Sequence, residues 1–446
     1  MTYDVALSGD SLLNRRISVI DEPDFRSIIE LFQNADIGYT HLETSIYDYD
    51  DDEMFPVAEA GGTWQRAPPF VAEELKWAGF DIVSHASNHA LDGAYGGLYS
   101  TWEALDEIGI PYAGTGMDLG EARAPAYLDT EVGRVGLVSM ATSFQRWARA
   151  GEARSDFRGR PGVNPLRYNY EVGPEELEEV KKLGEKMGWW ITNLENSWLL
   201  HPPGLHNTLF EFIERDEPGM EMVPNEDDRE GNLRSIRDAS RQSDLAMAHL
   251  HIHEWKPEED PSVSPDWVPE FARDSVDAGA DIVIVQGSHA PFRGIEAYDD
   301  SIIFYDLGDF FLMSNTVEKL PADYYTRWRR GLEVHRKDAT PSEGYDARPE
   351  SWGVVHPPGG YRSHSPVLGN IVPVCEMSDD GDVLRVELHP ALMGEKALEG
   401  PVKTAGLPMR ATGQKAQKIV EHIDALSQPY DTEVTHEDGV GVITFE

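Results

Sequence analysis

The sequence predicts an α/β fold in which helices cover layered strands, and three observations lead to this prediction. Short apolar runs alternate with amphipathic stretches through residues 1–145, and the same alternation returns through residues 243–312. Strand–helix alternation at this spacing is typical of an α/β layered sheet. Hydrophobic residues make up 40% of the 446 residues and aromatic residues 10%, which is enough to fill a sizeable core.

The N-terminal part supplies the first run of alternation. Its expected strands are residues 3–7, 36–42, 80–85, 126–130 and 134–140, and its expected helices are residues 24–33, 69–78 and 96–108. Residues 146–241 interrupt the pattern and are rich in Glu, Pro and Gly, so we expect an insertion beside the main sheet. Within it, helices are expected over 174–187 and 226–241.

The alternation then resumes and the chain ends in a further extension. The expected elements are strands 244–250 and 281–286, helix 265–278, a hairpin across 294–306 with its turn at 299–300, strands 371–376 and 383–389, helix 413–426 and strand 439–445. Residues 313–364 read as irregular. We therefore predict a main domain, residues 1–312, and a C-terminal extension, residues 313–446, that packs on it.

The charge balance is strongly acidic. Asp and Glu total 80 against 38 Lys and Arg, for a formal net charge of −42. Such a field repels nucleic acid and anionic membranes, so no nucleic-acid partner is expected. A disordered acidic chain is disfavoured by the 11 Trp and 17 Tyr. A salt-adapted protein is the better interpretation, because the Debye length falls to about 3 Å at molar salt and surface self-repulsion largely vanishes.

Other sequence features concern compartment and redox state. No run of 18 or more apolar residues is present, so no membrane span is expected. The N-terminus leads directly into a strand pattern without a basic and apolar leader, and we expect a cytoplasmic protein. The single cysteine, Cys375, excludes intrachain disulfides and thiolate metal clusters.

Polar residues gather where the predicted strands end. These clusters are Gly9-Asp10, His41-Leu42-Glu43, residues 85–89, residues 249–254 and Gly287-Ser288-His289. The carboxyl ends of strands in an open α/β sheet border a common crevice. Each cluster alone has a structural explanation, such as a helix cap or a hydrogen-bonded histidine. Together they favour a divalent-metal site, because carboxylate, amide and imidazole groups are the ligands that such ions prefer.

Alternation sharpens this expectation for the histidines. His249, His251 and His253 lie two residues apart, so on an extended strand all three face the same side. His41 and Glu43 have the same spacing.

In chain order, the clusters resemble the CapA family of capsule-synthesis proteins, whose domain has the calcineurin-like metallophosphatase fold. The matching segments are Gly9-Asp10 with Arg15, His41-Leu42-Glu43-Thr44, Ser87-Asn88-His89-Ala90-Leu91-Asp92, Leu250-His251, Gly287-Ser288-His289 and residues 305–310. The resemblance covers residues 3–145 and 243–312, and with the acidic composition it indicates a salt-adapted, haloarchaeal-type member. It implies a layered α/β sandwich of the metallophosphatase type.

The resemblance also implies roles for individual residues. The implied metal ligands are Asp10, Glu43, Asn88, His251 and His289. Glu43 would be the bridge if two ions bind. His89 would donate a proton or stabilise the transition state, and Arg15 and Arg293 are expected anion contacts. One or two divalent ions are implied, with Mn, Fe or Zn suiting the ligand set better than Mg.

The sequence departs from the family pattern at four positions. Leu12 stands where metallophosphatases usually have a histidine, and Gln286 where a first imidazole is expected. His41 and Asp309 each replace a usual Asn. His41 and His253 are therefore additional candidate ligands. The segment Asn193-Leu194-Glu195 repeats a family motif but is out of order, and we place it outside the site.

Two functions from different classes remain open. The first is a metal-dependent hydrolase that acts on a phosphoester or a polyglutamate-like amide through an activated water. The second is a non-catalytic protein of capsule or polymer biosynthesis that binds a polymer or partner through a degenerate metallophosphatase fold. The expected ligand is a small molecule or an anionic polymer in either case.

Overall fold

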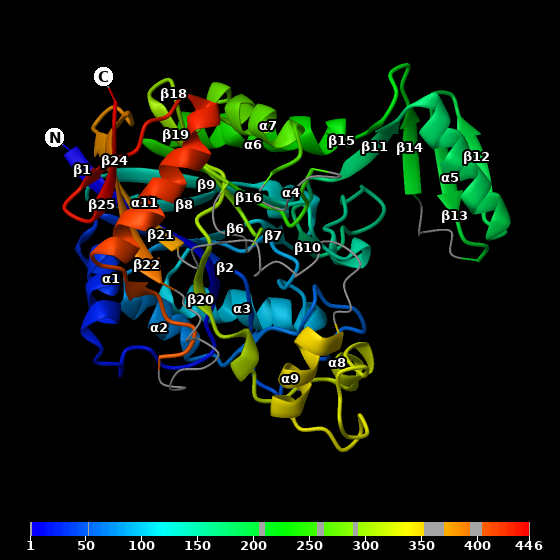
Figure 1. Cartoon of the computed structure of the whole chain (residues 1–446), viewed down its shortest axis with the longest axis horizontal. Coiled ribbons are helices and arrows are strands. Elements are labelled where there is room, and N and C mark those ends of the chain that lie inside the picture. Colours follow the sequence, from blue (N-terminus) through cyan, green and yellow to red (C-terminus); the bar gives the residue numbers. More distant parts are fainter. Residues whose placement is uncertain are drawn as a thin grey trace.

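The computed structural model describes residues 2–51, 53–204, 210–256, 263–288, 293–351, 370–392 and 404–445. Two sheets lie against each other at the centre of the molecule, and helices cover their outer faces (Figure 1). The fold is therefore a layered α/β sandwich, which confirms the predicted fold class.

The first sheet has the strand order β24-β25-β22-β21-β1-β2-β5-β6, with β20 also paired to β1 and β23 to β22. Its strands are β1 (Thr2–Leu12), β2 (Ile37–Leu42), β5 (Ile82–Ser84), β6 (Tyr112–Ala113), β20 (Asp309–Leu312), β21 (Asn370–Ser378), β22 (Val383–Leu392), β23 (Met409–Arg410), β24 (Thr435–Glu437) and β25 (Val440–Thr444). Strands β1, β2 and β5 are parallel, whereas β21 pairs antiparallel with β1. The C-terminal part of the chain thus extends the sheet that the N-terminus begins.

The second sheet has the order β18-β19-β17-β16-β9-β8. Its strands are β8 (Ala126–Thr130), β9 (Gly133–Ala141), β16 (Leu245–His251), β17 (Ile282–Gln286), β18 (Ile295–Tyr298) and β19 (Ser301–Phe304). Strands β9, β16, β17 and β19 are parallel. Tyr298 pairs with Ser301 across the turn between β18 and β19, and Asp299 takes a φ of 51° there. The predicted hairpin and its turn are confirmed.

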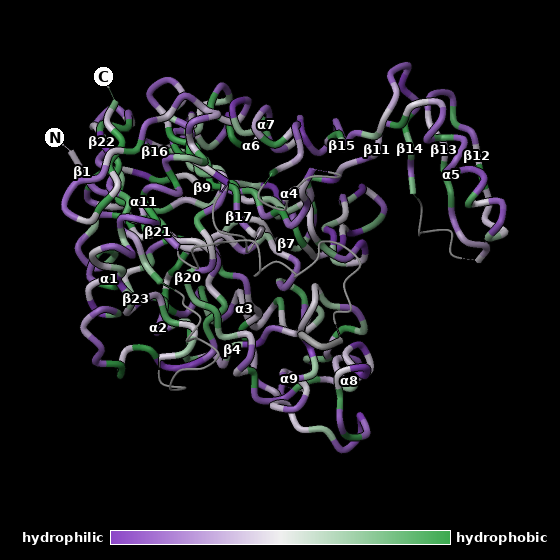
Figure 2. Tube along the Cα trace, viewed as in Figure 1, coloured by the Kyte–Doolittle hydropathy of each residue, from purple (hydrophilic) through white to green (hydrophobic). Residues whose placement is uncertain are grey.

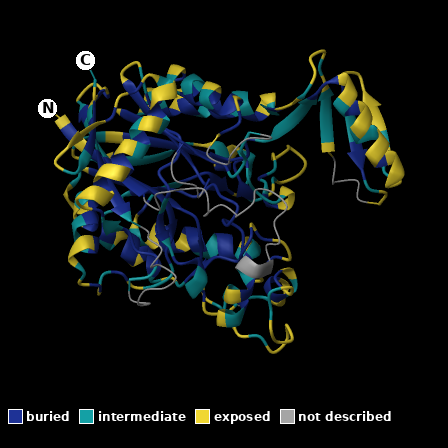
Figure 3. Ribbon diagram, in the orientation of Figure 1, coloured by how far each residue is buried: buried dark blue, intermediate teal, exposed yellow. Residues whose placement is uncertain are grey.

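The central core lies between the two sheets. Val5 and Leu7 of β1 belong to the same buried cluster as Leu137 of β9 and Met247 of β16. Helix α11 (Gln414–Ser427) adds Ile419 to this cluster. Apolar segments concentrate along these strands (Figure 2), and buried residues fill the sandwich whereas exposed ones lie on the outer helices (Figure 3).

Amphipathic helices cover the outer faces. Helices α1 (Pro23–Asn34), α2 (Val71–Ala78) and α3 (Ala94–Ile108) pack on the first sheet, and α6 (Glu226–Gln242) and α7 (Trp267–Asp277) on the second. In α1 the buried residues are Phe25, Ile28, Ile29 and Phe32, the spacing of a helix with one apolar face. The helical periodicity therefore accounts for how these segments cover the sheets.

Residues 168–224 of the predicted insertion form an arm that projects from the sandwich (Figure 1), whereas β10 (Gly162–Val163) stays beside β7 (Thr115–Gly116). The arm comprises β11 (Tyr168–Val172), α5 (Pro174–Lys186), β12 (Trp190–Leu194), β13 (Ser197–His201), β14 (Phe210–Glu214) and β15 (Met220–Pro224). Its strands make a separate sheet in the order β12-β13-β14-β11-β15. Both helices expected in this stretch are confirmed, and α6 contacts β9 and β16 of the second sheet.

Shorter elements complete the chain. They are β3 (Ser45–Ile46), β4 (Arg66–Ala67), β7 (Thr115–Gly116), α4 (Leu119–Arg123), β10 (Gly162–Val163), α8 (Ala322–Arg327) and α9 (Pro341–Ser351). The stretch expected to be irregular thus holds two helices, and α8 buries Tyr324 in a cluster with Trp64 and Val57. No helix in the described part of the chain is both long and apolar enough to span a membrane.

Candidate metal centre

The carboxyl ends of strands from both sheets meet at one edge of the sandwich. Asp10 lies in β1 and pairs with His41 of β2 on one side and with Asp309 of β20 on the other. Gly9 permits this arrangement, because a Cβ there would lie 1.7 Å from the carbonyl oxygen of Gly308. The close approach of β1 to the loop before β20 therefore requires glycine, and it brings two carboxylates to the same edge.

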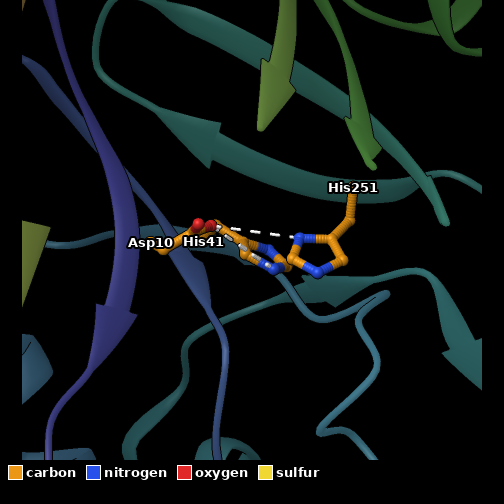
Figure 4. A group of neighbouring side chains, drawn as sticks. All are labelled: Asp10, His41 and His251. Atoms are coloured by element: carbon orange, nitrogen blue, oxygen red, sulfur yellow. Dashed lines mark ion pairs between the residues drawn. The ribbon is translucent and has the colours of Figure 1, made fainter. Parts of the chain in front are cut away.

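Three overlapping groups of side chains at this edge can hold a metal ion. Their members are Asp10 with His41 and His251, Glu43 with His251 and His253, and Asp10 with Glu43 and Asp309; the ligand atoms within each group all lie within 4.8 Å of one another. Figure 4 shows the first group, in which both imidazoles lie beside the Asp10 carboxylate. Shared members link the groups, so the arrangement suits one ion or two.

The separations fit ligands arranged around an ion. His41 Nε2 lies 3.9 Å and His251 Nδ1 4.0 Å from Asp10 Oδ1, and His251 Nε2 lies 3.6 Å from Glu43 Oε1. Atoms that bind one ion at about 2.1 Å lie roughly 3 to 4 Å apart. Hydrogen bonds between these atoms would be shorter. These separations are compatible with side chains that share a bound ion.

Burial makes these charges costly without a cation. Asp10 and Glu43 have no solvent exposure. The pKa of Asp10 is raised well above its usual value by burial and by the nearby carboxylates of Glu43, Asp309 and Asp306, and a hydrogen bond from Gln286 only partly offsets this. Like charges held together away from water favour either protonation or a bound cation. This cluster is a suitable cradle for a divalent ion.

His41 is prepared as a neutral ligand. Burial, with smaller effects from His249 and His85, lowers its pKa well below the usual value. Its Nδ1 is 2.8 Å from the Ser84 hydroxyl, which orients the ring with Nε2 toward Asp10. Among the described residues His41 Nε2 is buried and makes no hydrogen bond. A buried imidazole nitrogen in this state, beside a carboxylate, fits a metal ligand.

The strand-end histidines behave as the alternation predicts. The ring of His249 stacks on that of His41 with 4.3 Å between the ring centroids. The centroid of the His251 ring lies 4.9 Å from that of His41, so both histidines of β16 face the same side. His253 follows the strand, and its Nε2 is 3.1 Å from His251 Nε2. Its placement beside Glu43, at 3.9 Å, brings it into one of the candidate ligand groups.

The loop after β5 contributes an amide and a histidine. Asn88 Oδ1 is 3.0 Å from His251 Nε2, which joins this loop to the second sheet. His89 Nδ1 is 2.6 Å from Asp92 Oδ2, and the backbone N–H of Gln65 also donates to that carboxylate oxygen at 2.6 Å. The pKa of Asp92 is raised by burial, and His89 acts in the opposite direction. Sequence reasoning selected His89 but missed Asp92 as its partner; the i, i+3 spacing was the available signal.

The remaining predicted residues occupy varied positions. Arg15 donates a hydrogen bond to the carbonyl of Ala405, and Arg293, only 3% exposed, donates to the carbonyl of Glu254 at 2.9 Å. The charge of Arg293 also lowers the pKa of Asp306, against a larger effect of burial. His289 lies outside the described residues. The anion-contact role of the two arginines stays a prediction.

One departure from the family pattern, Gln286, has a clear structural role, and the repeated Asn193-Leu194-Glu195 motif lies in the arm. Gln286 ends β17, donates to the carbonyl of Gly308 at 2.8 Å and accepts from the N–H of Leu307 at 3.2 Å. It therefore supports the loop that carries Asp309. Glu195 lies at the β12–β13 turn of the arm, with a φ of 27°, in the arm's separate sheet.

A two-sheet α/β sandwich with carboxylates and imidazoles at the strand ends is the metallophosphatase type of fold. The model of the family described as "Bacterial capsule synthesis protein PGA_cap" matches residues 4–314, and this chain belongs to that family. The predicted CapA resemblance is thereby confirmed.

Relatives extend the similarity beyond the family model. Two proteins of Sinorhizobium fredii (strain NBRC 101917 / NGR234), the uncharacterized proteins y4sH and y4uA, are each 31% identical over 441 residues. These alignments cover 98% of this chain and 91% of each relative. The arm and the C-terminal strands thus belong to the aligned region as well as the sandwich.

Proposed function

We propose that this member of the capsule-synthesis family is a metal-dependent hydrolase of a phosphoester or a polyglutamate-like amide. The observation that carries the proposal is the convergence of Asp10, Glu43 and His251 from two sheets on one buried point. Among the described residues, Asp10, His41, Glu43, His251, His253 and Asp309 would hold one or two divalent ions, with Asn88 beside them. A divalent ion there would activate water and polarise a phosphoryl or carbonyl oxygen.

The His89–Asp92 pair supplies the proton-transfer chemistry. With its Nδ1 bonded to a carboxylate, the imidazole carries its proton there and presents Nε2 to a substrate. Asp92 also stabilises the imidazolium form, so His89 can protonate a leaving group from Nε2. Asp92 is held in turn by the Gln65 backbone, which keeps the pair rigid.

Two observations favour the alternative of a non-catalytic binding protein. Leu12 is 4% exposed at the position where a ligand histidine is usual, and Gln286 is engaged in holding the loop before Asp309. A degenerate centre of this kind would bind a polymer or a partner without turnover. The buried His89–Asp92 pair favours the hydrolase, because a binding protein has no use for it.

The two functions are separated by metal analysis and an activity screen. The protein is purified at molar salt and loaded with Mn, Fe or Zn, and bound metal is measured by mass spectrometry. Phosphomonoesters, phosphodiesters and γ-glutamyl peptides are then tested as substrates. Stoichiometric metal with hydrolysis of one class supports the hydrolase. Absence of bound metal after loading, or no turnover in any class, overturns it.

A variant pair then assigns the proton donor. His89→Ala should lower kcat by about 100- to 10,000-fold, which is what general acid catalysis contributes, while bound metal is retained. His436→Ala is the matched control, because His436 is exposed in β24. Equal rates in the two variants would exclude His89 as the donor.

A further inference from the structure

Away from the candidate metal centre, the molecule has a hollow whose lining is rich in arginine although the whole chain is strongly acidic. It lies between α4 and α6, has a volume of about 720 Å³, and is bordered by Arg123, Arg234, Arg237 and Arg241. None of the candidate metal ligands lines it. We call it the arginine hollow. Its size is in the range of about 300–1,000 Å³ that is usual for ligand pockets.

Helix α6 presents three of these arginines on one face. Arg234, Arg237 and Arg241 lie at positions i, i+3 and i+7, and all three are exposed. Like charges at this spacing oppose helix formation. Arg241, in the last turn, is favoured by the helix dipole, but Arg234 and Arg237 lie further back and gain little from it.

The three arginines that α6 contributes to the hollow form no ion pair with any residue that the structure describes. Within the described residues Arg234, Arg237 and Arg241 have no carboxylate within 4.0 Å, although the chain has 80 acidic residues against 38 basic ones. Arg229, on the same helix, behaves differently and pairs with Asp274 and with Glu230 at 2.9 Å. The guanidinium groups of these three α6 arginines therefore remain available to a ligand.

Arg123 forms an anchored part of the wall. Its Nη2 is 2.9 Å from Asp228 Oδ1 and its Nε is 3.4 Å from Asn164 Oδ1. It lies across α6 at Gly231, where a Cβ would be 2.2 Å from Arg123 Nη1. Glycine in the middle of a helix is unfavourable, so its presence here needs a reason. That reason is the passage of the arginine over the helix.

Carboxylates border the hollow, but among the described residues none forms an ion pair with the three α6 arginines. Asp118, Glu152 and Asp238 are the acidic residues of its lining. Asp118 caps α4 by accepting from the N–H of Glu121 at 3.0 Å. Because Arg123 is paired with Asp228, three arginines of α6 face three lining carboxylates, and the local charge is close to balanced in a chain of net charge −42.

We propose that the arginine hollow is a binding site for a ligand with two or more acidic groups, either carboxylates or phosphates. The planar guanidinium binds both groups through paired N–H donors, and neighbouring arginines on one helix face can hold two groups of one ligand. The size of the hollow fits a small metabolite or a short segment of an anionic polymer. The site is separate from the candidate metal centre and does not depend on its activity.

The test is calorimetric titration of the full-length protein with pyrophosphate and with tricarballylate. The double variant Arg234→Gln/Arg237→Gln should weaken binding by about tenfold or more. The control is Arg329→Gln/Arg330→Gln, which removes the same charge from two exposed arginines outside the hollow and should bind as the unaltered protein does. A preference for pyrophosphate assigns a phosphate ligand, and a preference for tricarballylate a carboxylate ligand.

Both probes also bind free metal ions, so Asp10→Asn is titrated in parallel. Retention of binding in this variant, together with loss in Arg234→Gln/Arg237→Gln, supports the proposal. Three results would overturn it: a Kd weaker than about 1 mM for both probes, equal weakening in the two arginine double variants, or loss of binding in Asp10→Asn. The first two results leave the proposed hydrolase untouched, whereas loss of binding in Asp10→Asn would place the probes at the metal centre and so leave the proposed hydrolase standing.

Discussion

The candidate metal centre and the arginine hollow both gather charged side chains, but they differ in burial. Asp10 and Glu43 are removed from solvent, whereas Arg234 and Arg237 are exposed. An ionised group taken out of water needs a partner charge or loses its ionisation, while a surface charge keeps its hydration. Changes at the centre should therefore alter metal binding and stability together. Changes at the hollow should alter ligand binding alone.

The largest effect is expected from Asp10→Asn. This residue belongs to two of the three candidate ligand groups, so its loss should weaken metal binding by more than the 10- to 100-fold that loss of an outer-shell partner costs. Competition with a chelator of known affinity measures the change. The matched control is Glu195→Gln, which alters the glutamate of the repeated Asn193-Leu194-Glu195 motif in the arm and should bind metal normally. Unchanged metal affinity in Asp10→Asn would show that the metal binds at a site that does not include Asp10.

A partly buried carboxylate outside the metal centre tests the effect of burial on a carboxylate that has no part in metal binding. Asp281 immediately precedes β17, at the end of the strand opposite to Gln286, and accepts from the N–H of Ala246 at 2.7 Å. Burial raises its pKa to about 7. Because the folded-state pKa is higher than the unfolded one, its stabilising contribution is complete below about pH 4 and is lost as the pH rises through 7.

Asp281→Asn removes this titration. The free energy of unfolding of the variant, relative to the unaltered protein, should rise by about 2 to 4 kcal/mol between pH 4 and pH 8. Urea unfolding at a series of pH values measures it. Glu131→Gln, an exposed change in the turn between β8 and β9, should show no such trend. If the difference in unfolding free energy between Asp281→Asn and the unaltered protein did not change with pH, burial would not raise the pKa of Asp281.

The next effect concerns the partner of His89. Asp92→Asn should lower kcat by about 10- to 100-fold with bound metal retained, because the imidazole loses the group that orients it. The double variant with His89→Ala should be no slower than His89→Ala alone, since the two residues act as a unit. Additive losses in the double variant would show that Asp92 acts independently of His89.

The smallest effect is expected at the hollow. Arg234→Gln/Arg237→Gln should change the free energy of unfolding by less than about 0.5 kcal/mol, as is usual for exposed side chains away from packed features. Urea unfolding in the absence of ligand measures it. A loss of unfolding free energy as large as that of a core substitution would mean that these arginines stabilise the fold. Changes at the hollow would then affect stability as changes at the metal centre do.

Much of the site was accessible from local sequence patterns. Parallel strands end at a shared edge, so the clusters after three early strands were expected to meet those of β16 and β17. The two-residue spacing of His249 and His251 predicted their common side, and the stacking of His249 on His41 confirms it. The hairpin turn at Asp299 and the apolar face of α1 followed equally from short-range rules.

Other features depend on residues that are distant in the chain. Asp309 joins Asp10 because β20 pairs with the end of β1 on the side opposite to β2, and the C-terminal β21 pairs along the start of β1 on that same side. The i, i+3 spacing of His89 and Asp92 is a local signal, but the conformation of the loop after β5 is what brings the Asp92 carboxylate onto His89. Irregular loops carry no periodicity from which such contacts can be inferred.

The sequence by itself determined the α/β class, the family and the side chains available for a metal, because period, composition and ordered motifs are properties of the chain. Only the tertiary structure decided which of them share a centre, and that the arginines of α6 border a hollow with Arg123 of α4. The reason is physical: strand pairing and helix packing join residues hundreds of positions apart. Burial then determines whether each charge needs a partner, and burial cannot be inferred from a local segment because it depends on what packs against that segment.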